Sequence, residues 1–195
     1  MIGMNNMNRG YYFFTPINIT NTMRELWEQH GLWTRSFIIS KVMDLPDLQY
    51  VTDRLLRNPT DFADVLNPFY GEENSKKFEQ LLCVHLLIAA ELVENAKKGD
   101  AEAANKSREN WYRNADEIAY FFSSINPYWS YAEWREMLFH HLRLVEEEAT
   151  LRLNKKYQDD IALYDTIEEQ ALQMADMMSM GIISQFRLCE NRMTF

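Results

Sequence analysis

The sequence predicts an all-α protein, a bundle of five or six helices. Apolar residues recur at intervals of three and four positions over long windows, which is the period of an amphipathic helix. Six glycines and five prolines are few for 195 residues, and no strand-like alternation bounded by turn pairs is present. The chain is 47% hydrophobic and long enough to bury one core, so we expect a single domain.

Prolines and turn residues divide the chain into helical windows. Long windows without proline are expected near residues 19–44, 74–98, 102–124, 129–156 and 158–187, with a shorter, broken helical piece over 47–67. We expect residues 19–188 to form the bundle domain, residues 1–18 a flexible N-terminal arm and residues 189–195 a C-terminal tail. Within the broken piece, the segment RNPTD predicts a helix start with Asn58 as N-cap and Pro59 at the first helical position.

Equal spacings predict an internal repeat of about 56 residues. Arg57 precedes His85 by 28 residues, and Arg113 precedes His141 by 28 residues. The first helical window adds a third copy, because RELWEQH and REMLFHH place their last histidines in register. The three histidines, including His30, therefore lie 55 and 56 residues apart.

The repeated histidines are the main functional signal. Residues three and four positions from each are largely apolar, so all three imidazoles are expected to face the core. A metal ion is one way to give a buried imidazole its partners. Glu148 lies near the azimuth of His141, and Glu168 falls on the apolar stripe predicted for the last window, through Ile161 and Tyr164. The candidate metal ligands are therefore His30, His85, His141, Glu148 and Glu168, a set that suits iron or manganese, with zinc as a further candidate.

Three functions follow from this pattern. A metal with an open coordination position would support oxygen or peroxide chemistry, as in a metal-dependent oxidoreductase, or metal storage. The sequence does not indicate a substrate. Alternatively, the chain is a non-catalytic structural or self-assembling scaffold whose histidines satisfy one another and nearby carboxylates. A third alternative is haem held by two of the histidines. The residues alone leave all three open.

Composition and charge narrow the partners. The formal charge of −9 disfavours nucleic acid, and the apolar run from Leu81 to Val93 is shorter than the roughly 20 residues that cross a bilayer, so no membrane partner is expected. The two cysteines, Cys83 and Cys189, form no disulfide framework, and the first 20 residues do not resemble a secretory signal. We therefore expect a cytoplasmic protein, and a homo-oligomer.

Long segments, among them LWEQHGLWTR, RLLRNPTDF, NADEIAYFFSSINPYW and YDTIEEQALQMAD, resemble a family of bacterial helical proteins over residues 23–187. Members often carry the label acetylglutamate kinase. This chain has neither the βαβ alternation nor the glycine-rich phosphate loops of an amino-acid kinase, so we expect no such activity. The paired His-and-Glu helices are also similar to a two-repeat, ferritin-like, metal-binding bundle family, which implies His85, His141 and Glu148 as ligands.

Overall fold

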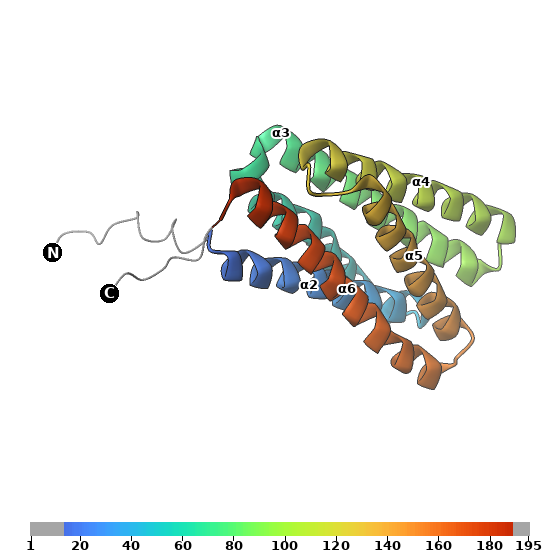
Figure 1. Ribbon diagram of the computed structural model, residues 1–195. Helices are drawn as coiled ribbons and strands as arrows, with labels where there is room; N and C mark the ends of the chain where they lie inside the picture. Colours follow the sequence, from blue (N-terminus) through green and yellow to red (C-terminus); the bar gives the residue numbers. More distant parts are fainter. Residues whose placement is uncertain (1–13, 189–195) are drawn as a thin grey trace.

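The computed structural model describes residues 14–188, and within that range it is entirely helical, with no strand. The elements are α2 (Pro16–Val42), α3 (Leu48–Lys98), α4 (Ala101–Ile125), α5 (Tyr131–Leu153) and α6 (Tyr157–Phe186) (Figure 1). The predicted all-α class is confirmed. Residues 1–13 of the predicted arm and the predicted tail, 189–195, lie outside the described range. None of the helices in the described part of the chain combines the length and apolarity needed to cross a membrane.

Helix α2 begins before its predicted start, at Pro16 rather than near residue 19. The Thr15 side chain accepts a hydrogen bond from the backbone N–H of Asn18, and proline takes the first helical position, where its missing N–H costs nothing. The Phe14 ring packs edge-on against Phe69, with ring centroids 5.2 Å apart. The last residues of the predicted arm therefore belong to the bundle.

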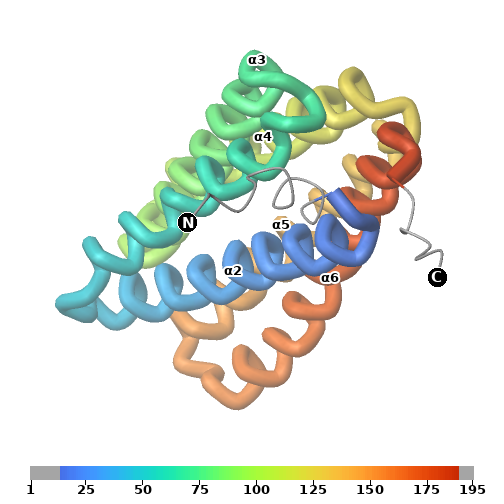
Figure 2. The backbone as a smooth tube through the Cα atoms, turned by 90° about the vertical axis from the view of Figure 1, so that its left-hand side faces the viewer, coloured from blue at the N-terminus to red at the C-terminus, as the bar shows by residue number. Residues whose placement is uncertain are grey.

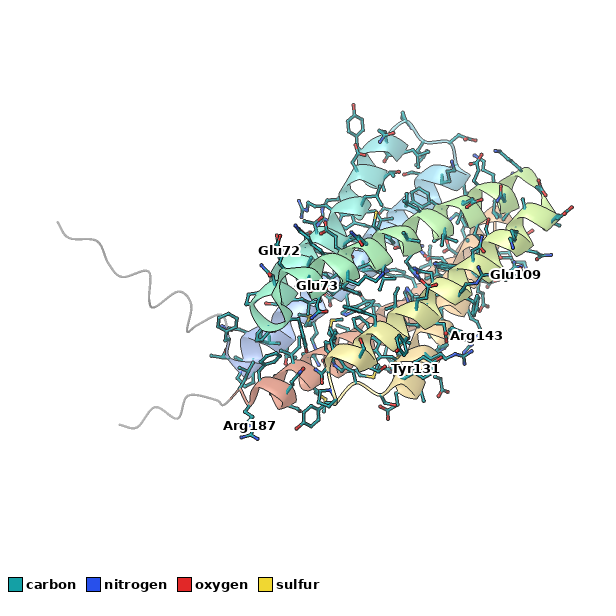
Figure 3. The ribbon with its side chains drawn as sticks, turned by 90° about the horizontal axis from the view of Figure 1, so that it is seen from above. Glu72, Glu73, Glu109, Tyr131, Arg143 and Arg187 are labelled. Carbon is teal, nitrogen blue, oxygen red and sulfur yellow. The ribbon has the colours of Figure 1, made fainter. Side chains whose placement is uncertain are left out.

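Helix α3 consists of two helices joined at Gly71. This glycine has φ 76° and ψ 169°, a conformation that L side chains rarely adopt, and the chain folds back there so that the two halves lie side by side (Figures 1 and 2). Glu72 and Glu73 mark the bend in Figure 3. The predicted helix start at Asn58 is wrong, because Asn58 and Pro59 lie inside the first half of α3. The Asn58 side chain is used in a contact with α2 instead of capping a helix.

The bend gives the bundle three helical hairpins. The first hairpin is α2 with the first half of α3, the second is the second half of α3 with α4, and the third is α5 with α6. Neighbouring hairpins pack together, and α2 also packs against α6, so that the three hairpins form a closed ring. Arg24 and Asp176 join α2 to α6 through two hydrogen bonds of 2.7 Å.

A continuous series of buried aromatic rings connects the three hairpins. Ring centroids lie 5.2 Å apart between Trp27 and Phe62, 5.8 Å between Phe62 and Phe78, 4.9 Å between Phe78 and Phe122, and 4.5 Å between Phe122 and Trp134. The series runs from α2 through both halves of α3 and α4 to α5. Large buried rings contribute much of the apolar burial in a core, so these contacts hold the hairpins against one another.

Trp129, in the link between α4 and α5, contacts the backbone of α6. Trp129 is buried, and its indole N–H donates to the backbone carbonyl of Met177 at 3.2 Å. A Cβ atom placed on Gly181 would lie 1.9 Å from the indole nitrogen. The close approach of the indole to the helix backbone therefore requires glycine at position 181.

Candidate functional site

The three repeated histidines are buried at equivalent places in the hairpins. His30 lies on α2, His85 on the second half of α3 and His141 on α5, so each belongs to the first helix of its hairpin. The prediction that all three face the core is confirmed. Their burial excludes water as the main hydrogen-bonding partner of the rings, so partners within the protein decide their state.

Each imidazole is hydrogen-bonded to a side-chain amide on the second helix of its own hairpin. The distances from Nδ1 to the amide oxygen are 3.0 Å for His30 and Asn58, 2.8 Å for His85 and Asn114, and 2.9 Å for His141 and Gln170. Each amide nitrogen in turn donates, at 3.1 Å, to the backbone carbonyl four residues before the histidine, which belongs to Leu26, Leu81 or Met137. We call this arrangement of histidine, amide and carbonyl the histidine–amide pin.

The amide orientation fixes the tautomer of each pin histidine. Because the amide nitrogen donates to a carbonyl, the amide oxygen faces the ring, and the ring nitrogen Nδ1 must be the donor. The neutral imidazole then carries its lone pair on Nε2. In His85 this lone pair accepts a hydrogen bond from the indole N–H of Trp111 at 3.1 Å, so both nitrogens of that ring are satisfied.

Burial keeps the pin histidines neutral. It lowers the pKa of His85 and of His141 to about 3, and it also lowers the pKa of His30. The proximity of the rings adds to the effect, since a charge on His30 would repel charges on the other two. The centroids of the His30 and His141 rings are 5.7 Å apart. A histidine with so low a pKa is a weak general base near neutral pH.

The carboxylate predicted beside His141 belongs to a separate buried charge cluster. Glu148 is only 1% exposed, and Arg35 of α2 donates to its side chain. Arg35 also binds Asp160 of α6, with distances of 2.8 and 3.4 Å, and Arg152 forms an ion pair with the same aspartate. Burial raises the pKa of Glu148 to about 7, against the lowering effect of Arg35. We call these four residues the buried charge cluster.

The five predicted metal ligands are not brought together. Glu148 lies seven residues along α5 from His141, which is roughly 10 Å of helix. Glu168 is exposed, because the buried stripe of α6 passes through Ile167, Gln170 and Ala171 and not through the predicted Ile161. Among residues 14–188, no group of three or more His, Cys, Asp or Glu side chains is arranged to hold a metal ion.

The amide partners are the site residues that the sequence-based prediction missed. Asn58, Asn114 and Gln170 are spaced 56 residues apart, the same interval as the predicted repeat. That spacing could have indicated the amides from the sequence, although the residue at the third position is glutamine and not asparagine.

No family model, curated protein or solved structure matches this chain.

Proposed function

We propose that the protein is a non-catalytic helical scaffold in which the histidine–amide pins fix the two helices of each hairpin in register. The observation that carries the proposal is the use of each histidine in the same structural bond. In every pin the imidazole N–H and both ends of the amide have partners within the hairpin. A polar contact buried in this way favours one register over others, because any shift would leave its groups unpaired.

The recurrence of the pin supports an internal repeat as the origin of this scaffold. The amides are spaced 56 and 56 residues apart and the histidines 55 and 56. We propose that one helical hairpin was copied twice and that its pin was kept, because removing either the histidine or the amide leaves the other buried without a hydrogen-bond partner. The Trp111 contact with His85 is then an addition within the second hairpin.

The scaffold proposal is tested by the state of the imidazoles and by metal content. Protein expressed with iron, manganese and zinc supplied should contain no stoichiometric metal by elemental analysis. Nitrogen-15 NMR should show His85 and His141 as neutral Nδ1–H tautomers from pH 5 to pH 8, since their pKa is about 3. Stoichiometric metal that is lost in His141→Ala and kept in His140→Ala, whose side chain is exposed, would replace the scaffold with a metal-binding function.

Metal binding is the second candidate function, and the pair His30 and His141 favours it. Their rings are neighbours, and a hydrogen bond at Nδ1 leaves the Nε2 lone pair for other use, which is how proteins usually orient ligating histidines. The residues present do not fit the five-ligand set, because Glu148 binds Arg35 and Glu168 is exposed. A relationship to ferritin-like bundles, or haem held by two of the histidines, would each be a form of this metal-binding function.

A metal site formed by His30 and His141 predicts a distinct pattern of binding among the histidine variants. Titration of the metal-free protein with Zn²⁺, Mn²⁺ or Fe²⁺ should then show binding that is lost in both His30→Ala and His141→Ala. His85→Ala should keep binding, since Trp111 already occupies the free nitrogen of that ring. Equal loss in all three variants would favour a site shared by all the histidines, and absence of binding in the wild type would favour the scaffold.

A further inference from the structure

A cavity of about 70 Å³ lies between α2, α3, α4 and α5. It exists where the helices carry small side chains, since Ala89, Ala90 and Ala149 line it at positions where longer residues would fill the space. The volume exceeds the roughly 10–15 Å³ that one water molecule needs and is about half of the ~150 Å³ of an engineered cavity that holds benzene. Most of the remaining lining is apolar, so the cavity suits a small organic molecule.

The cavity wall contains one polar group without a partner. Thr34 of α2 lines the cavity and is 8% exposed, and its hydroxyl oxygen forms no hydrogen bond. A buried hydroxyl without a partner carries an unfavourable free energy of desolvation. A ligand that brings a hydrogen-bonding group to this position would remove that cost.

The rim of the cavity indicates that the ligand is neutral. Arg108 of α4 and Glu146 of α5 both belong to the lining, and they pair with each other, with Arg108 Nε 2.5 Å from a carboxylate oxygen of Glu146. The rim therefore offers no unpaired charge to an ionised ligand. A charged group entering the apolar interior would lose its hydration without gaining a partner.

We propose that this cavity binds a small aliphatic alcohol, with the alkyl chain against the alanines and the hydroxyl on Thr34. The inference does not depend on the proposed scaffold function, because none of the pin histidines lines the cavity. Trp111 lines the cavity and its indole N–H donates to His85, so the signal of that N–H is a probe for a ligand that contacts the Trp111 ring.

The proposal is tested by titrating the nitrogen-15-labelled protein with ethanol, whose three heavy atoms are half the six of benzene, and following the indole N–H signal of Trp111. The wild type should show a saturable shift. Ala149→Leu should abolish it by filling the cavity, and Ala90→Leu is the second filling variant should the first fail to fold. Ala162→Leu makes the same substitution on the exposed face of α6 and should leave the titration unchanged.

The hydroxyl contact is tested separately with Thr34→Val, which keeps the shape of the side chain. Loss of one hydrogen bond should weaken ethanol binding about fivefold, whereas binding of xenon, which is smaller and has no hydroxyl, should not weaken. A shift that rises linearly without saturation, or saturable binding that survives both filling variants, would overturn the site. Equal ethanol affinity in the wild type and Thr34→Val would overturn the assignment of an alcohol.

Discussion

Replacing Gln170 with leucine breaks the third histidine–amide pin from its amide side. Gln170 is buried, its oxygen accepts from His141 at 2.9 Å, and its nitrogen donates to the Met137 carbonyl at 3.1 Å. Leucine removes both hydrogen bonds, each worth about 0.5–1.5 kcal/mol. It also leaves the Nδ1–H of the buried His141 imidazole without an acceptor, which adds a cost of about 1–3 kcal/mol. Because these terms overlap, we expect Gln170→Leu to lower the free energy of unfolding by about 2–4 kcal/mol.

The assay is urea denaturation of four proteins that form a double-mutant cycle. These are the wild type, Gln170→Leu, His141→Leu and the double variant. In the double variant neither side chain is left buried without its partner. Its loss of unfolding free energy should therefore be smaller than the sum of the two single losses by about 1–3 kcal/mol. Gln173→Leu, on the exposed face of the same helix, is the matched control and should change stability by no more than about 0.5 kcal/mol.

Two outcomes would refute the reasoning. One is a loss for Gln170→Leu no larger than that for Gln173→Leu, which would mean that the pin contributes little. The other is strict additivity of Gln170→Leu and His141→Leu, because partners in one buried hydrogen bond must be energetically coupled.

Three further predictions follow from the buried groups and the close contact at α6. Stability should fall as the pH drops from 6.5 toward 3, by up to about 1.4 kcal/mol per pH unit for each of His85 and His141, because the unfolded chain binds protons there that the folded chain excludes; a flat urea-denaturation profile over that range would contradict it. Glu148 acts in the opposite sense, since its raised pKa gives stability that is present below pH 4.5 and lost as the pH rises through about 7. Glu148→Gln should therefore gain stability relative to the wild type across that window, and parallel pH profiles would exclude the effect. Gly181→Ala should lower the melting temperature and lose about 1–3 kcal/mol, because its Cβ would meet the Trp129 indole; exposed Met180→Ala is the control, and an unchanged melting temperature for Gly181→Ala would show that the indole moves freely.

The sequence was sufficient to predict one half of each pin. Helix periodicity determines which face of a helix is buried, and it therefore placed His30, His85 and His141 in the core. The amide half was missed at Asn58 because an Asn-Pro pair such as Asn58-Pro59 is typical of helix starts. Inside α3 the same asparagine side chain reaches across to α2, a contact that local sequence patterns do not encode.

The buried charge cluster shows a second limit of the same kind. The azimuth of Glu148 relative to His141 correctly predicted a buried carboxylate. Its partner, Arg35, is 113 residues away along the chain, and periodicity within one helix says nothing about which residue of another helix lies opposite. A buried carboxylate with an unknown partner fits a metal ligand and an ion pair equally well, so the sequence alone did not separate them.

The contact between α2 and α6 sets the number of hairpins in this protein. An open solenoid grows by adding units at its ends and needs polar caps there, whereas a ring has no end units. A fourth hairpin added before α2 or after α6 could join the ring only by separating α2 from α6 and breaking the pair of Arg24 and Asp176. A circular permutant that joins the end of α6 to the start of α2 and opens the link between α4 and α5 would keep all three pins, because each pin lies within one hairpin.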